Sequence, residues 1–191
     1  MRRRSPIPLA ALVAWAAATT ACLAVALADP VRDLRHPAVT GSAAVTVGWM
    51  LLAWAAMAVR TDRVARGLWT LGLAALGVHL VLAFWLAHGW SHAAAVEHVR
   101  EVGGSGAGIV VNYLFALVWA ADVVWWWAAP AGHARRPRWV GALLHGFLAF
   151  VVVNATVVFG PAERRVAYAL ALGLVAALAW LRRSESHLGT S

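Results

Sequence analysis

The sequence predicts an all-α, polytopic bundle of about six membrane-spanning helices in a single domain, residues 1–191. Of the 191 residues, 62% are hydrophobic and 13% are charged, and the mean hydropathy of +0.72 lies far outside the range of soluble proteins. The apolar residues also form six runs of about 20 residues, the length that crosses the hydrocarbon core as a helix. The lipid bilayer is therefore the first partner that the sequence indicates.

The six predicted spans are separated by connections rich in turn-forming and charged residues, such as "ADPVRDLRHP" and "APAGHARRPR". Only the third connection is long, and it forms an outer loop over residues 89–107. The spans cover residues 7–28, 39–59, 67–88, 108–129, 139–160 and 165–181.

The first run also resembles a signal peptide, since "MRRR" precedes it and "ALA" before Asp29 fits an A-x-A cleavage site. A signal h-region has roughly 7 to 15 residues, fewer than this run, so we expect an uncleaved helix. Cleavage would leave five spans with the same topology.

The arginines predict the orientation. The chain has 16 arginines and no lysine. If the N-terminus lies inside, the inner segments hold eleven arginines and the outer segments five, which favours two cytoplasmic termini. Because the arginines are dispersed between apolar runs, the net charge of +8 does not indicate nucleic acid as a partner. A lysine-free composition rich in Ala, Arg and Trp is typical of a GC-rich bacterial genome, and we expect the inner membrane.

Tryptophans mark the predicted inner ends of the fourth and fifth spans. Trp125, Trp126 and Trp127 end the fourth span, and Trp139 begins the fifth. Such residues typically anchor helices in the headgroup layer. A stacking platform for a cofactor is the alternative interpretation.

Four polar side chains lie inside the fourth and fifth spans, where inserting an ionisable group is costly. Asp122 and His145 lie about 10 Å and 9 Å from the same membrane face at 1.5 Å per residue. Antiparallel neighbours would bring them within reach of a hydrogen bond or ion pair. Asn112 and Asn154 could meet near the outer ends. The interpretations are a polar clamp that sets helix register, a proton relay or substrate contact, and a metal or cofactor ligand.

His79 lies near the middle of the third span without an acid at i±3 or i±4. We expect a neutral histidine bonded to a neighbouring helix. The alternatives are a haem or metal ligand and a polar path towards the outer surface.

The outer stretch "HGWSHAAAVEHVRE" suggests a metal site. His88 and His92 are spaced i, i+4, as are Glu97 and Glu101, and His98 lies beside the second pair. Each pair lies on one helical face, and two such pairs facing each other could bind zinc, iron or manganese. HxxxH without an intervening Glu is a weak motif, and the solvated face of an interfacial amphipathic helix uses the same residues.

The sixth span carries a stripe of small residues, Ala169, Gly173 and Ala177. Such stripes allow close helix packing, here within the bundle or between subunits of a homo-oligomer.

The segment "HGWSHAAAVEH", followed by "NYLFALVWAADVVWWW", resembles a set of uncharacterised bacterial multi-pass inner-membrane proteins. They share a histidine-rich outer loop and an N-Y-x-F-x-x-x-W-x-x-D-x-x-W-W segment. The resemblance covers about residues 79–127, with the "FLAF" and "VVFG" pieces of the fifth span. The set has no assigned activity, so the resemblance implies a six-span fold and no catalytic residues.

These observations favour a non-enzymatic integral membrane protein that binds a metal or small ligand through its outer loop and polar interior. One alternative is a membrane redox protein or haem carrier with histidine ligands. Another is a small proton-coupled transporter centred on Asp122 and His145, although matched broken helices are lacking. No nucleophile motif supports a hydrolase.

Overall fold

The computed structural model describes residues 7–59, 61–160 and 162–188, and all regular structure in these ranges is helical. Within these described ranges, six helices are long and apolar enough to cross a membrane, and each overlaps one predicted span. The predicted all-α, multi-pass architecture is therefore confirmed. The six are α1 (Leu9–Ala28), α2 (Pro37–Ala58), α3 (Asp62–Leu82) with its extension η1 (Ala83–Ala87), α5 (Gly108–Ala128), α7 (Arg138–Val153) with its extension η2 (Asn154–Val158), and α8 (Ala162–Leu188).

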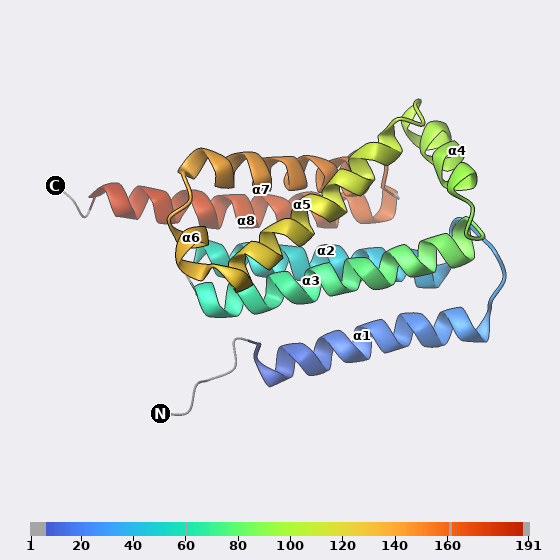
Figure 1. Ribbon diagram of the computed structural model, residues 1–191, viewed down its shortest axis with the longest axis horizontal. Coiled ribbons are helices and arrows are strands. Elements are labelled where there is room, and N and C mark those ends of the chain that lie inside the picture. The colour runs from blue at the N-terminus through green and yellow to red at the C-terminus, as the bar shows by residue number, and fades with distance from the viewer. Residues whose placement is uncertain (1–6, 60, 161, 189–191) are drawn as a thin grey trace.

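Two shorter helices lie at opposite ends of the bundle (Figure 1). The amphipathic α4 (His92–Gly103) occupies most of the predicted outer loop, residues 89–107. The interpretation of this segment as an amphipathic helix is therefore confirmed. The single-turn α6 (Pro130–Ala134) lies at the other end, where α1 begins and α8 ends. We refer below to the α4 end and the α6 end.

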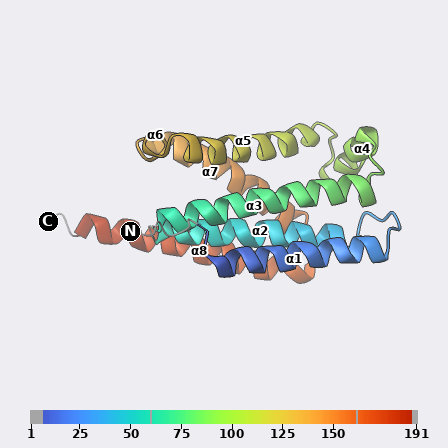
Figure 2. The same ribbon diagram turned by 60° about the horizontal axis from the view of Figure 1, so that its bottom comes forward.

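The long helices form a ring. α2 and α3 make the most extensive contact, α5 packs on α3, α7 packs on α5, and α8 returns to α2. α1 lies outside this ring against α2 and α3 (Figures 1 and 2). It is joined to the bundle by the Trp15 indole, which donates a hydrogen bond to the Leu71 carbonyl over 2.9 Å.

Local sequence signals account for the helix ends. His36 precedes α2, and its Nδ1 accepts the backbone N–H of Ala38, while Pro37 fills the first helical position without wasting a donor. Ser91 caps α4 by accepting the N–H of Ala94, and Gly104 ends it with a left-handed φ of 77°. α3 begins five residues before the predicted span, because hydropathy marks the apolar run and not the polar first turn of a helix.

The main core fills the ring. Trp69 and Trp119 are fully buried with ring centroids 4.8 Å apart. Gly72 allows this packing, since a Cβ there would lie 2.7 Å from the Trp119 ring. Apolar side chains from α2, α5 and α7 complete this core, among them Met50, Phe115 and Leu148.

The outer face of α8 is apolar and exposed, as expected of a surface turned to lipid. Val166, Leu170 and Leu174 are each more than 60% exposed. The small-residue stripe lies on exposed positions too, and a Cβ on Gly173 would meet nothing within 4 Å. Packing of Ala169, Gly173 and Ala177 inside the bundle is therefore wrong, and contact between subunits stays a prediction.

Candidate functional site at the α6 end

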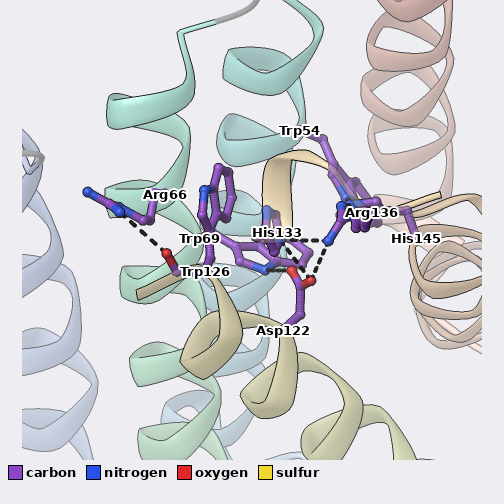
Figure 3. Close-up of polar contacts among 8 residues, drawn as sticks. All are labelled: Trp54, Arg66, Trp69, Asp122, Trp126, His133, Arg136 and His145. Carbon is purple, nitrogen blue, oxygen red and sulfur yellow. Dashed lines mark hydrogen bonds and ion pairs between the residues drawn. The ribbon is translucent and has the colours of Figure 1, made fainter. Parts of the chain in front are cut away.

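Asp122 is the centre of a buried polar network. Its carboxylate is fully buried, and Oδ2 accepts the Trp69 indole N–H over 2.9 Å. Oδ1 lies 2.6 Å from Nη1 of Arg136 and 3.1 Å from Nε2 of His133 (Figure 3). We call these residues, with His145 and Trp54, the Asp122 cluster. A carboxylate surrounded by a guanidinium and an indole donor is compensated although it lies in an apolar bundle.

The connection between α5 and α7 folds back to supply two members of this cluster. Pro130 begins α6 at its first helical position, and the helix turns His133 inward. The His133 ring stacks on Trp126 with centroids 4.5 Å apart and an interplanar angle of 8°. Arg136 then reaches Asp122 from the following turn, with only 14% of its side chain exposed.

His145 belongs to the same cluster, but its predicted direct hydrogen bond or ion pair with Asp122 is not formed between these two described residues. Arg136 lies between them, because Nη1 contacts Asp122 and Nη2 lies 3.2 Å from Nε2 of His145. On the opposite side of the His145 imidazole, the Trp54 indole donates to Nδ1 over 3.2 Å. The structure places the two residues in one cluster, and the cation that lies between them was not predicted.

The contacts define the protonation state of His133. Nη1 of Arg136 lies 2.6 Å from both Asp122 Oδ1 and His133 Nε2, and its two hydrogens can serve both. His133 Nε2 must then accept, which leaves a neutral ring protonated at Nδ1. Burial lowers the pKa of His133 below its usual 6.5, and the positive charge of Arg136 lowers it further against the opposing effect of Asp122.

The cluster contains more hydrogen-bond donors than acceptors. Indole and guanidinium N–H groups only donate, and a neutral imidazole has one accepting nitrogen. Both nitrogens of His145 face such donors, so one of the two contacts places N–H against N–H. Nearby, Nε1 of Trp119 and Nε of Arg66 are buried without a partner in the part of the chain that the structure describes. Buried unpaired donors are costly and require an explanation.

The predicted tryptophan belt has two roles. Trp126 stacks inward on His133, whereas Trp127 donates to Thr70 over 2.9 Å and lies under the Arg66 guanidinium, 4.2 Å from the ring centroid. Trp139 is 65% exposed, as expected of an interfacial anchor. Arg66 also donates to the Trp126 carbonyl over 3.4 Å (Figure 3).

The other predicted interior residues do not join the cluster. His79 pairs across helices, with Nδ1 3.1 Å from the Ser42 hydroxyl of α2, as expected for a packed membrane histidine. Asn154 donates to the Phe150 carbonyl of its own helix, and Asn112 is exposed. No hydrogen bond joins these two amides within the described ranges.

At the α4 end, His88 and His92 do not share a helical face. η1 ends before His88, and the next two residues adopt left-handed backbone, Gly89 with φ 56° and Trp90 with φ 62°. This turn separates the two imidazoles, so their i, i+4 spacing has no helical meaning. His92 instead pairs with the Tyr113 hydroxyl over 2.8 Å.

The structure brings only two residues of the predicted metal site together. The rings of His88 and His98 lie 5.5 Å apart, whereas Glu97 pairs with Arg100 on the surface and Glu101 is exposed. Among the described residues, no three His, Cys, Asp or Glu side chains gather closely enough to hold a metal ion. Burial and the neighbouring His98 lower the pKa of His88.

Sequence reasoning missed His133, Arg136, Trp69 and Trp54. One signal was available: a carboxylate inside a span needs a cation, and the nearest arginines follow it in the next connection. Because the low hydropathy of the connection between α5 and α7 indicated a solvent-exposed segment, its side chains were not considered as partners of Asp122.

Comparison of the chain with known protein families, curated proteins and solved structures finds no match.

Proposed function

We propose that this is a non-enzymatic multi-pass protein of the bacterial inner membrane whose Asp122 cluster binds a small anion at the cytoplasmic end. The distribution of arginines supports this orientation, because the α6 end has the larger number. Both termini are then cytoplasmic. The resemblance to uncharacterised bacterial membrane proteins agrees with this location.

The observation that carries the proposal is the position of His145 between two obligate donors. Trp54 and Arg136 each direct N–H groups at this ring, which can accept only one hydrogen bond. An acceptor bound beside His145 would take the surplus donor and remove the conflict. The indole N–H of Trp119, which has no partner among the described residues, is a further donor in the same core.

The charges favour an anion over a metal cation. Arg136 neutralises Asp122, and Arg66 adds a second positive charge at this end, 3.4 Å from the Trp126 carbonyl. The oxygens of Asp122 already accept from Trp69 and Arg136, and the ring of His133 lies against Oδ1. A cation would need these oxygens, whereas an anion would use donors that lack acceptors.

The test is titration of the protein in nanodiscs with chloride, acetate and phosphate, followed by tryptophan fluorescence. The emission should respond saturably because indoles surround the cluster. Arg136→Gln should weaken binding about tenfold or more, since a hydrogen bond to a charged group contributes about 1.5–3 kcal/mol. The matched control is Arg135→Gln, which removes the same charge from an exposed neighbour.

Two results would reject this proposal. One is a wild-type protein that shows no saturable response to any of the three anions, which would leave the cluster as a polar clamp between helices. The other is an equal loss of affinity in Arg136→Gln and Arg135→Gln, which would indicate general attraction to a basic surface.

A proton-coupled transporter is the second candidate, because two imidazoles contact the guanidinium of Arg136. Protonating either imidazole would add a positive charge beside Arg136 and strengthen anion binding. Liposomes loaded with a pH-sensitive dye would then acidify when an anion gradient is applied. A haem carrier or redox protein predicts visible absorption by protein purified without a histidine tag.

A further inference from the structure

His88 and His98 form an unusual pair at the α4 end, remote from the Asp122 cluster. Nδ1 of each ring is buried and has no hydrogen-bond partner within the described ranges. The two rings come from different elements, His88 from the turn after η1 and His98 from α4, yet their centroids lie 5.5 Å apart. Unsatisfied buried nitrogens on two adjacent imidazole rings require an explanation, and one ligand shared by both rings provides it.

The backbone holds His88 in place. Its N–H donates to the Ala83 carbonyl over 3.0 Å, which closes the π-helical turn. Phe84 lies edge-on against the ring with centroids 5.9 Å apart, and Trp90 stacks on Phe84 while holding its left-handed φ. π-helical turns and strained residues are both frequent at functional sites.

His98 is held by the docking of α4 on α5. Ala95 is buried, and Gly106 and Gly108 allow the chain before α5 to approach α4 closely. A Cβ on either glycine would lie 2.8 Å from a valine methyl group of α4, on Val96 or Val99. Both imidazoles are thus positioned before any ligand binds, which reduces the entropic cost of binding.

The geometry points to a two-histidine copper(I) site formed by Nδ1 of His88 and Nδ1 of His98. A neutral imidazole protonated at Nε2 presents a lone pair at Nδ1, and one metal ion can accept both lone pairs without release of a proton. Zinc requires at least three protein ligands even in its open sites, and no third metal-binding side chain joins these two in the described chain. Imidazole ligands suit copper. Its monovalent ion has a closed d10 shell and forms linear two-coordinate complexes, so two nitrogen donors are sufficient.

This inference does not depend on the proposed anion site, because the two lie at opposite ends of the bundle. Neighbouring side chains are engaged elsewhere. His92 pairs with Tyr113, and Glu97 pairs with Arg100 at the surface. They leave His88 and His98 as the ligands.

The test is an anaerobic titration of copper(I) into protein purified without a histidine tag, in competition with a coloured copper(I) chelator. Wild-type protein should bind one equivalent, and X-ray absorption should show two nitrogen neighbours. His88→Gln and His98→Gln should each weaken binding by about a hundredfold or more, since loss of a mere outer-shell partner already costs about 10–100-fold. His92→Gln is the matched control and should bind like wild type.

Three results would overturn the inference: no copper(I) bound by the wild type, equal binding by all three variants, or binding of zinc in place of copper. Thermal unfolding of each variant reports whether it is folded. If His88→Gln fails to fold, His98→Gln decides the question, because His98 lies on the amphipathic surface helix α4.

Discussion

The contact of Arg136 with both Asp122 and His145 predicts unequal energetic coupling in the cluster. Asp122→Ala removes the carboxylate that Arg136, His133 and Trp69 all contact. Removing one partner of a buried ion pair costs about 3–5 kcal/mol. Arg136 is 14% exposed and would keep its contacts with two imidazoles, so we expect a loss near the lower limit, about 3 kcal/mol.

Double-mutant cycles separate the two contacts. Asp122→Ala combined with Arg136→Ala should cost about 2 kcal/mol less than the sum of the single losses, because the second change removes a charge that the first has left unpaired. Asp122→Ala combined with His145→Ala should deviate from additivity by only about 0.5–1 kcal/mol, the low end of the range for residues that share a partner. The reason is that Arg136 separates these two side chains.

The assay is unfolding in mixed micelles by increasing fractions of sodium dodecyl sulfate, followed by tryptophan fluorescence. Asp62→Ala is the control, because this exposed aspartate at the same end contributes about 0.5 kcal/mol at the start of α3 and acts on the cluster only as a minor charge near His133. Additive losses for Asp122 and Arg136 would refute the reasoning. So would a larger coupling of Asp122 to His145 than to Arg136.

Three further predictions concern pH, packing and orientation. The lowered pKa of His133 means that the unfolded chain binds more protons below pH 6.5, so stability should fall as pH drops from 6.5, and less so in His133→Gln. An unfolding midpoint with the same pH dependence in both proteins would disprove this. Gly72→Ala should cost about 1–3 kcal/mol through overpacking against an indole, whereas Gly77→Ala, with nothing within 4 Å, should not destabilise in the same unfolding assay. In a cysteine-free background, Ser91→Cys should react with an impermeant maleimide on intact cells and Ala134→Cys only after lysis; the reverse pattern would invert the topology.

The predicted pairing of Asp122 with His145 shows how much of the site could be predicted from the sequence. Helical rise placed both residues at one depth, and the structure puts both in one cluster. The sequence could not show that Arg136 lies between Asp122 and His145. The position of Arg136 depends on the turn after α5, which begins at Pro130 and is stabilised by the stacking of His133 on Trp126.

The outer segment shows the opposite case, where a local spacing misled. The interval between His88 and His92 fits one helical face only if the helix is continuous, and left-handed residues at Gly89 and Trp90 interrupt it. The pairing of His88 with His98 instead arises because α4, which docks on α5, brings His98 beside the turn that follows η1. No periodicity in the sequence encodes that contact.

By itself, the sequence determined the number, order and approximate limits of the membrane helices, because hydropathy summed over about 20 residues decides whether a segment can leave water. It also singled out Asp122, since a carboxylate in such a segment must find a partner. Only the tertiary structure decided which partners those are. Arg136, His133 and Trp69 come from a connection and from a separate helix, and the contacts that join them depend on how the helices pack. Packing is specified by the whole core at once, so no local pattern could have identified them.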